Sequence, residues 1–396
     1  MAADRPESRG NAGILPCQRS LFEIPDEVAY FNCAYMTPSL AAVRQAGEAG
    51  VGRKSRPWEL TPPDFFTESE QARSAFARLI GATAEDVAIV PSASYGIETA
   101  ARNLAVGPGQ EILVIAEQFP SNVYPWQVLA ERDGATVRTI ARGNDGGFTS
   151  GLLQAIGPQT AIAALPHCHW SDGALLDLAA IGAALRRQGA ALVLDVTQSL
   201  GALPLDVAEI RPDFMVCASY KWLLGPYSLG FLFVAPERQD GEPLENNWIA
   251  REGSEDFRRL ATYSDAYAAG ARRFDMGERS NFALMPMALT ALEQLLEWTP
   301  PAIAASLGAT TARIAGELGA AGAVVAGAGM RAPHFLGVRL PGGLPDDLPQ
   351  RLVAENIHVS VRGDSVRVTP HLHVSDADIE RLCAAMRRHC GLDQRP

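Results

Sequence analysis

The sequence contains almost no lysine: of its 34 lysine and arginine residues, only Lys54 and Lys221 are lysines. Lys54 stands in a polar, charged stretch, GRKSRPWE, where a solvated side chain is expected. Lys221 stands between Tyr220 and Trp222, among apolar residues. A lysine removed from water has a lowered pKa, which suits its amine to form a Schiff base with a carbonyl. The alternative is a lysine that extends from a surface turn into solvent.

Metal-binding and membrane-spanning patterns are also missing. The six cysteines show no paired spacing of the zinc or redox kind, so we expect buried free thiols and no metal site. His167 and His169 invite a metal interpretation, but spacing places no third ligand, and polar contacts to a ligand are favoured. No apolar run would cross a bilayer and the first twenty residues lack a signal-peptide core, which predicts a cytoplasmic protein without a membrane partner. The net charge of -11 argues against a nucleic-acid partner.

Apolar runs of strand length alternate with segments of helical spacing through most of the chain. This alternation predicts an α/β fold, with a mostly parallel sheet flanked by helices. After Val234 the alternation weakens, and short strands followed by a final amphipathic helix predict a smaller α+β domain. We therefore divide the chain into a mobile tail, a large domain and a small C-terminal domain that opens near the helix ending at Trp298, with the ranges 1–20, 21–270 and 271–396.

The stretch from Ala191 to Val234 carries the most informative polar residues. Its first apolar run ends in Asp195, and Gln198 follows three residues later. A second apolar run leads into Lys221, and a third closes the stretch. An acid, an amide and an amine thus each follow a predicted core strand, at the edge of an open α/β sheet where ligands bind.

Two further turns follow predicted strands. The strand Val87–Val90 leads through SASYG into a helix predicted to begin near Ile97. Small and hydroxyl residues at such a turn leave backbone N–H groups free for a phosphate, and a plain serine N-cap is the alternative. Phe119 follows the strand 112–116, where an aromatic ring stacks on a planar ligand or belongs to the core. The GAGMRA sequence near Gly329 resembles a dinucleotide fingerprint, but Pro333 follows where its helix should run, so we discard it.

The order of these residues resembles the class V aminotransferases. The carriers of the resemblance are a strand ending in DVTQ, from Asp195 to Gln198, and then SYK, with Lys221, before a glycine-containing strand. These are pyridoxal phosphate enzymes of fold type I that include cysteine desulfurases, kynureninases and isopenicillin N epimerases. FPSNVYPW and SYKWLLGPYSLGFLFV look closest to the epimerase-like members. The resemblance, from about Phe31 to the final helix, implies a large domain that binds pyridoxal 5'-phosphate, a small amino-acid substrate and a homodimer.

The resemblance also implies a role for each candidate residue. Lys221 would hold the cofactor as a Schiff base and act as the base that moves the α-proton. Asp195 would keep the pyridine nitrogen protonated, and Gln198 would bond the ring oxygen. Arg367 matches the arginine that binds a substrate carboxylate, a task that suits a planar bidentate donor. The other candidates are Ser94, Tyr95 and Ser219 for the phosphate, Phe119 stacked on the ring, His169 facing the ring, and Asn32 and Tyr35 near the substrate.

Three departures from the family pattern bear on function. The segment NIHVSVRGDSVRVTP lacks the cysteine of the desulfurases, which argues against sulfur transfer by that route. GERSN, with Glu278 and Arg279, stands where many relatives place a threonine that reaches the partner's phosphate, and Ser280 or Asn281 could replace it. His169 to Asp172 replaces an asparagine-containing motif.

The pattern of residues leaves the reaction open. We place amino-group transfer first because the family label is broad, with β-lyase and epimerase activities as alternatives on the same residues. A binding protein without turnover would not need Lys221, Asp195, Gln198 and Arg367 together. A nicotinamide dehydrogenase would need a glycine-rich strand-to-helix turn that the sequence lacks.

Overall fold

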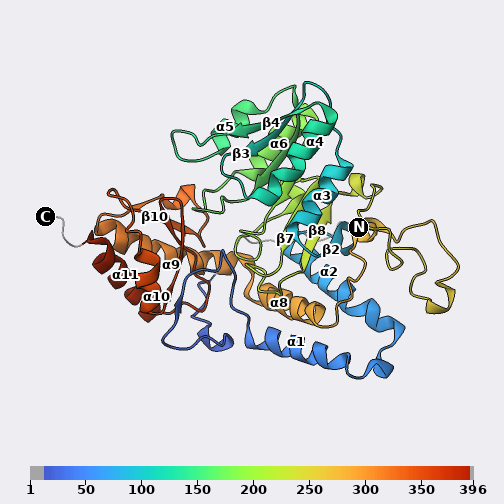
Figure 1. Ribbon diagram of the computed structural model, residues 1–396, viewed down its shortest axis with the longest axis horizontal. Helices are drawn as coiled ribbons and strands as arrows, with labels where there is room; N and C mark the ends of the chain where they lie inside the picture. The colour runs from blue at the N-terminus through green and yellow to red at the C-terminus, as the bar shows by residue number, and fades with distance from the viewer. Residues whose placement is uncertain (1–12, 393–396) are drawn as a thin grey trace, which may run out of the picture.

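The structure, a computed structural model, describes residues 13–392. Within these residues a seven-stranded sheet carries helices on both faces, and a four-stranded antiparallel sheet lies in the C-terminal part (Figure 1). The strand order of the large sheet is β2-β8-β7-β6-β5-β3-β4. The strands from β7 to β4 are parallel, and β8 is antiparallel to both of its neighbours. The predicted α/β fold with a mostly parallel sheet is confirmed.

The bounds of the elements follow the predicted apolar runs closely. The strands of the large sheet are β2 (Val87–Val90), β3 (Glu111–Ile115), β4 (Thr136–Ile140), β5 (Thr160–Pro166), β6 (Ala191–Asp195), β7 (Phe214–Ala218) and β8 (Gly230–Val234). The helices in the first three quarters of the chain are α1 (Ala41–Arg53), α2 (Thr67–Ile80), α3 (Ala93–Asn103), α4 (Tyr124–Asp133), α5 (Thr149–Ala155), α6 (Leu178–Gln188), α7 (Val207–Ile210) and α8 (Leu284–Trp298). The remaining elements are β1 (Ala29–Tyr30), α9 (Pro300–Ala320), β9 (Val324–Val325), β10 (Leu336–Arg339), α10 (Leu348–Ala354), β11 (Ile357–His358), β12 (Ser360–Arg362), β13 (Ser365–Val368) and α11 (Asp376–Cys390).

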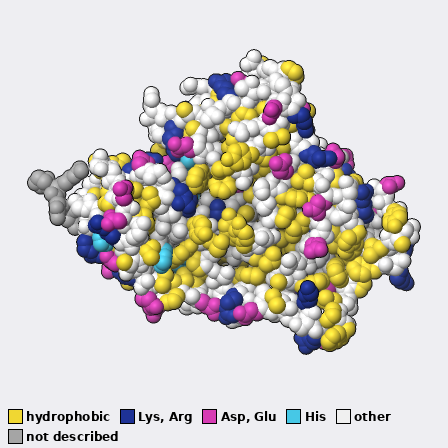
Figure 2. Space-filling model, in the orientation of Figure 1, with side chains coloured by type: hydrophobic (Ala, Val, Ile, Leu, Met, Phe, Trp, Pro, Cys, Tyr) yellow, Lys and Arg dark blue, Asp and Glu magenta, His cyan; other side chains and the backbone are white. Residues whose placement is uncertain are grey.

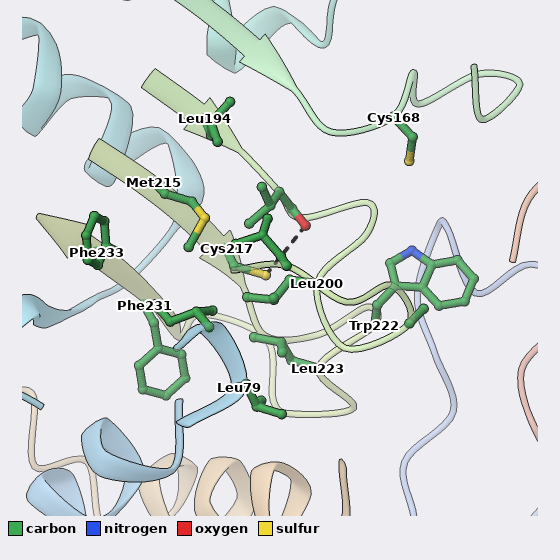
Figure 3. Close-up of a cluster of buried hydrophobic side chains, with 14 of the residues drawn as sticks. Leu79, Cys168, Leu194, Leu200, Met215, Cys217, Trp222, Leu223, Phe231 and Phe233 are labelled. Atoms are coloured by element: carbon green, nitrogen blue, oxygen red, sulfur yellow. Dashed lines mark hydrogen bonds between the residues drawn. The ribbon is translucent and has the colours of Figure 1, made fainter. Parts of the chain in front are cut away.

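The large sheet is buried on both faces, which explains its continuous apolar runs. Along β6, Leu192 and Leu194 belong to the core beneath α2, α6 and α8, whereas Val193 belongs to the core beneath α3 and α4. Figure 3 shows the first core, where Met215 from β7 lies beside Phe233, its partner on β8. Since successive side chains of a strand point to opposite faces, each strand contributes to both cores.

The small sheet is amphipathic instead. Its apolar face, with Val338, Val366 and Val368, packs against α9, α10 and α11 in a core of its own. The alternate positions, which include Arg339 and Arg367, face the loops of the large sheet: the side chain of Arg367 donates to the carbonyl of Trp170. Period-two alternation in the sequence therefore places arginine side chains between the two parts of the molecule.

The packing of α8 bears on the predicted division of the chain. We expected this helix to open the small domain after residue 270, but α8 lies against α1 and α2 and shares the core of the large sheet. Its buried residues include Met285, Leu292 and Leu295. We therefore propose that the boundary lies at Thr299, between α8 and α9.

The predicted N-terminal tail also needs a correction. Residues 1–12 lie outside the described residues. Residues 13–20, however, run along the C-terminal part: the backbone N–H of Gln18 donates to the carbonyl of Leu372 at 2.7 Å. The Arg19 guanidinium pairs with the Asp378 carboxylate at 2.9 Å. The segment is thus held by charge and backbone hydrogen bonds that the sequence alone does not reveal.

Helix α3 begins at Ala93, earlier than the predicted start near Ile97. Ser92 caps it, because its Oγ accepts the backbone N–H of Tyr95 at 3.2 Å. At Gly96 a Cβ atom would lie 2.6 Å from the Val216 side chain, so glycine lets the first turn of the helix approach β7 closely. This approach brings the helix N-terminus to the edge of the sheet where β6 and β7 end.

A buried ion pair connects α2, β2 and the segment before α8. The guanidinium of Arg73 and the carboxylate of Asp275 are both fully buried and form two hydrogen bonds of 2.8 and 3.1 Å. Asp275 also accepts the backbone N–H of Ile89 at 2.7 Å, and Arg73 also donates to the carbonyl of Val87. Removing one partner of such a pair leaves an uncompensated buried charge, which is strongly destabilising.

We predict that Asp275→Asn lowers the free energy of unfolding by about 3–5 kcal/mol, because the buried guanidinium groups of Arg73 and Arg279 would then share Glu70 as their one counter-charge among the described residues. Denaturant unfolding followed by circular dichroism measures this change. The matched control is Glu242→Gln, which removes the exposed pair of Glu242 with Arg102 and should cost less than about 1 kcal/mol. Equal unfolding midpoints for the two variants would contradict the role of the buried pair.

Candidate active site

A cavity of about 260 Å³ lies where β5, β6 and β7 end, in front of the N-terminus of α3. This is the sheet edge at which open α/β folds bind ligands. The volume is close to the lower end of the range of about 300–1,000 Å³ that is usual for small-molecule sites. The lining residues predicted from the sequence are Ser94, Phe119, Asp195, Gln198 and Lys221.

Lys221 is the amine of this cavity, and its side chain is only 7% exposed. Its Nζ lies 5.4 Å from the centre of the Tyr220 ring and 5.6 Å from that of Phe119. Within residues 13–392 the amine has no hydrogen bond or ion pair. Burial lowers its pKa to about 8, the attraction of Asp195 opposes this shift, and the repulsion of Arg367 adds to it. A solvated lysine in a surface turn does not have this burial.

Asp195 ends β6 and keeps part of its carboxylate free. Its Oδ1 accepts the backbone N–H of Thr197 at 3.0 Å, which fixes the carboxylate at the end of the strand. Because the described residues provide no cation within 4.0 Å, the charge of Asp195 is available to a ligand in the cavity. We expected the acid, the amide and the amine each to follow a strand of their own. Asp195 and Gln198 instead share the turn after β6, and Lys221 follows β7, because β8 is antiparallel and begins at this edge.

The carboxamide of Gln198 is held on two sides. Its Nε2 donates to the carbonyl of Ala34 at 3.0 Å, and its Oε1 accepts from the indole of Trp222 at 3.2 Å. An amide nitrogen carries two hydrogens, so one N–H remains for a ligand. The orientation of this side chain is therefore fixed by residues far apart in the sequence.

The three residues expected at the phosphate, Ser94, Tyr95 and Ser219, differ in their position. Ser94 lines the cavity, and its Oγ lies 2.9 Å from that of Ser92, the N-cap of α3. The hydroxyl of Ser219 donates instead to the carbonyls of Pro226 and Leu229, at 2.6 and 2.8 Å. The phenol of Tyr95 does not line the cavity; its pKa is raised by burial and by nearby acidic groups, of which Glu245 acts most strongly.

Two loops bring aromatic residues to the other side of the cavity. Phe119 and Trp170 both line it, with ring centres 5.7 Å apart in an edge-to-face arrangement. His169 does not: its fully buried ring stacks on Phe148, and its Nδ1 lies 2.8 Å from Ser171 Oγ. Successive residues of this loop alternate in direction, so the neighbours of His169 face the cavity while His169 faces the protein.

Arg367 comes from the small sheet and is 2% exposed. Its guanidinium donates to Ser360 Oγ at 2.9 Å, to the carbonyl of Trp170 at 3.0 Å and to Asn32 Oδ1 at 3.5 Å. No carboxylate of the described chain lies within 4.0 Å of it. Burial lowers its pKa to about 10, which still leaves the group charged at neutral pH. A buried cation without a protein anion is the arrangement expected where an anionic ligand binds.

Asn32 thus contacts Arg367, whereas Tyr35 remains on the surface with 57% exposure. The remaining lining residues, which we did not predict, include Ser92, Gln118, Ser121, Cys168, Trp170, Thr197, Tyr220 and Tyr227. Most of them stand within a few residues of a predicted strand end. Their position after a strand is the feature of the sequence that could have identified them as lining residues. The direction of each side chain, however, depends on the geometry of its loop.

In the GERSN segment we expected Ser280 or Asn281 to reach a partner's phosphate, but the side chains of this segment contact their own chain. Arg279 is buried and pairs with Glu70 at 2.9 Å, so it faces the protein. Ser280 Oγ donates to the carbonyl of Phe65, and Asn281 Oδ1 accepts the backbone N–H of Leu284 at the start of α8. Both hydroxyl and amide therefore have partners within the chain.

The described residues contain no group of three or more His, Cys, Asp or Glu side chains that could hold a metal ion. Across residues 13–392, no helix has both the length and the apolar character required to cross a membrane.

Comparisons with known proteins agree with the geometry. The chain is 32% identical over 216 residues to the uncharacterized aminotransferase YcbU of Bacillus subtilis, covering 54% of this chain and 55% of that protein. It is 30% identical over 183 residues to isopenicillin N epimerase of Streptomyces clavuligerus, covering 45% and 46%. Each match therefore spans about half the length of the curated relative.

A solved structure of a C-DES variant, with glycine covalently linked to its pyridoxal phosphate cofactor, has the same fold. It superposes with a TM-score of 0.82 at 20% identity and covers 96% of this chain and all of that chain, 100%. The family model for aminotransferase class-V matches residues 61–387. The chain therefore belongs to the class-V aminotransferase family of pyridoxal phosphate enzymes.

Proposed function

We propose that the protein is a pyridoxal phosphate-dependent enzyme that acts on the α-carbon of an amino acid by amino-group transfer. The observation that carries the proposal is the buried amine of Lys221, which has no polar partner among the described residues and lies within electrostatic reach of Asp195 and Arg367. An amine in this setting is partly neutral near pH 8 and reacts with carbonyls. The similarity to an aminotransferase over about half the chain supports the same class of reaction.

The donors of the cavity fit pyridoxal phosphate. This cofactor supplies an aldehyde that condenses with amines and a ring that accepts electrons from the α-carbon. Lys221 would hold the aldehyde carbon, and Asp195 would keep a proton on the ring nitrogen. The first turn of α3, with Ser94, would hold the phosphate, because N–H groups there lack partners within the helix. Gln198 would donate its free N–H to the ring oxygen, and Phe119 would lie against the ring.

Two residues would act on the substrate. Arg367 would bind the α-carboxylate, since its buried guanidinium is oriented by Ser360 and Trp170 and has no protein anion. Lys221 would take the proton from the α-carbon, because its lowered pKa leaves a fraction of neutral amine at physiological pH. Trp170 and Tyr220 line the cavity beside them and would exclude water.

Amino-group transfer needs one group that moves a proton between two carbons, and Lys221 is the one amine that lines the cavity in the described chain. Epimerase and β-lyase activities use the same residues and are the alternatives. Desulfuration through a loop thiol is not supported, because residues 356–370 contain no cysteine. Cys168 lines the cavity, but burial raises the pKa of its thiol, so it is protonated.

We infer a homodimer and a cytoplasmic location as well. Hydrophobic side chains gather across the middle of the face shown in Figure 2. Three exposed aromatic side chains, which contact with a second chain would cover, are Trp58, Trp248 and Tyr263, at 77%, 41% and 92% exposure in the single chain. Light scattering of the purified protein should give the mass of a dimer, and the mass of a monomer would contradict the inferred homodimer. Cell fractionation tests the cytoplasmic location.

Product analysis distinguishes the three reactions. With a panel of amino acids, we predict conversion to keto acids only when a second keto acid is present as amino acceptor. Release of ammonia without an acceptor would indicate a β-lyase, and loss of optical activity without new products would indicate an epimerase. Either result would overturn the transfer assignment while leaving the role of Lys221 in place.

Replacing Lys221 with Ala should abolish the visible absorbance of the bound cofactor, because no other amine lines the cavity in the described residues. Absorbance spectra of the purified variant and of the wild type measure the effect. Lys54→Ala is the matched control and should keep the wild-type band, since that side chain is exposed. A colourless wild-type protein that takes up no added cofactor would overturn the proposed function.

The lowered pKa of Lys221 predicts its labelling profile in cofactor-free protein. Carbamylation by cyanate consumes neutral amine, so the rate at Lys221 should reach half its maximum near pH 8. Peptide mass spectrometry measures the rate, with Lys54 in the same sample as the reference for reagent decay. Asp195→Asn removes the attraction that raises the pKa and should move the midpoint to lower pH. A midpoint above pH 10 would show that Lys221 is not desolvated.

A further inference from the structure

The face of the small sheet that points to the loops of the large sheet carries three arginines. In the pairing of β12, β13 and β10, Arg367 lies opposite Ser360 on one side and Gly337 on the other. The next residue on the same face of β12 is Arg362, and the next on β10 is Arg339, because side chains alternate along a strand. Both are diagonal neighbours of Arg367, at a spacing of roughly 7–8 Å between backbones.

Only one of these arginines is neutralised by the protein. Arg339 pairs with Asp364 at 3.0 Å and with Asp172 at 3.4 Å. For Arg362 and Arg367, the described residues offer no carboxylate within 4.0 Å. Asp172, a buried acid of the large domain, is already bonded to Arg142 at 3.0 Å.

Neighbouring groups do not supply the missing negative charge. Burial raises the pKa of Tyr30, whose phenol is therefore neutral and donates to the carbonyl of Met36 at 2.7 Å. Arg362 itself donates only to the carbonyl of Val361, at 2.8 Å, which leaves most of its five N–H groups free. Two guanidinium groups on one face thus lack counter-charges, which is costly for partly buried groups.

Arg362 and Arg367 both contact Trp170, a residue of the cavity wall. Arg367 donates to the Trp170 carbonyl, and the Arg362 guanidinium lies 5.9 Å from the centre of the Trp170 ring. Trp170 lines the cavity together with Lys221. Consistent with this position, the charges of both arginines lower the pKa of Lys221. Arg367 is the more deeply buried of the two, and Arg362 is half-buried at the end of β12.

We propose that the substrate is an amino acid whose side chain ends in a second carboxylate, and that Arg362 binds this distal group while Arg367 binds the α-carboxylate. The assignment rests on the proposed function. A planar guanidinium with free N–H groups matches a carboxylate in a bidentate manner. A neutral side chain in the same place would leave the charge of Arg362 uncompensated, so the pair of arginines selects acidic over neutral substrates.

Titration of the holoenzyme tests this assignment by the change in cofactor absorbance, with aspartate, glutamate and 2-aminoadipate against asparagine and glutamine. We expect the best acidic amino acid to bind at least about 10-fold more tightly than its amide. Arg362→Gln should weaken binding of the acid about 10- to 100-fold and that of the amide less than about threefold. Arg362→Lys should keep part of the preference, because it keeps the charge. Arg367→Gln should weaken both classes.

Arg339→Gln is the matched control on the same face, since the charge of Arg339 is already neutralised, and it should leave the ratio of acid to amide affinity unchanged. A wild type without preference for acids, or an Arg362→Gln variant that keeps the preference, would overturn the assignment. If amino acids still perturb the Lys221-dependent band in those cases, the proposed function stands. If no amino acid of either class perturbs that band, both proposals fail.

Discussion

The free energy cost of burying an amine without a partner is the constraint on which the site depends. Lys221 is held among Tyr220, Phe119 and the end of β7, where burial disfavours its charged form. The turn that carries it is closely packed: Gly201 has a φ of +100°, and a Cβ atom there would lie 2.2 Å from the carbonyl of Trp222. The close approach of the two turns fixes the backbone at Lys221, and the rings of Tyr220 and Phe119 lie beside its amine.

The positive charges of the site come from the second, smaller sheet. Its apolar face packs on α9 and α11, and this packing fixes which residues face the large domain. Arg367 and Arg362 consequently lie against Trp170, which lines the cavity together with Lys221, although more than one hundred residues separate the arginines from Lys221 in the sequence. Without a protein carboxylate, their charges raise the free energy of the empty site and favour anionic ligands. The desolvated amine of Lys221 and the unpaired charges of the two arginines thus favour binding of the same anionic ligand.

Strand positions and the ends of strands could be predicted from the sequence, because buried parallel strands give continuous apolar runs. β2 has the predicted bounds and β3 lies within one residue of its predicted run, while Asp195 ends β6 and Lys221 follows β7 as expected. Side-chain direction in loops could not be predicted. Ser219 has the right type and place, but two backbone carbonyls accept from its hydroxyl. His169 and Trp170 are adjacent, and only the fold determines which of them faces the cavity. The packing of α8 on α2 likewise depends on tertiary contacts, since its apolar spacing would suit either domain.

We propose that Lys221 alone forms the covalent link to the cofactor. Borohydride reduction of the holoenzyme, followed by peptide mass mapping, tests it most directly, because the chain contains just two lysines. We predict one reduced cofactor adduct, on the peptide that contains Lys221, with the Lys54 peptide unmodified. An adduct on Lys54, or no adduct on either peptide, would contradict it.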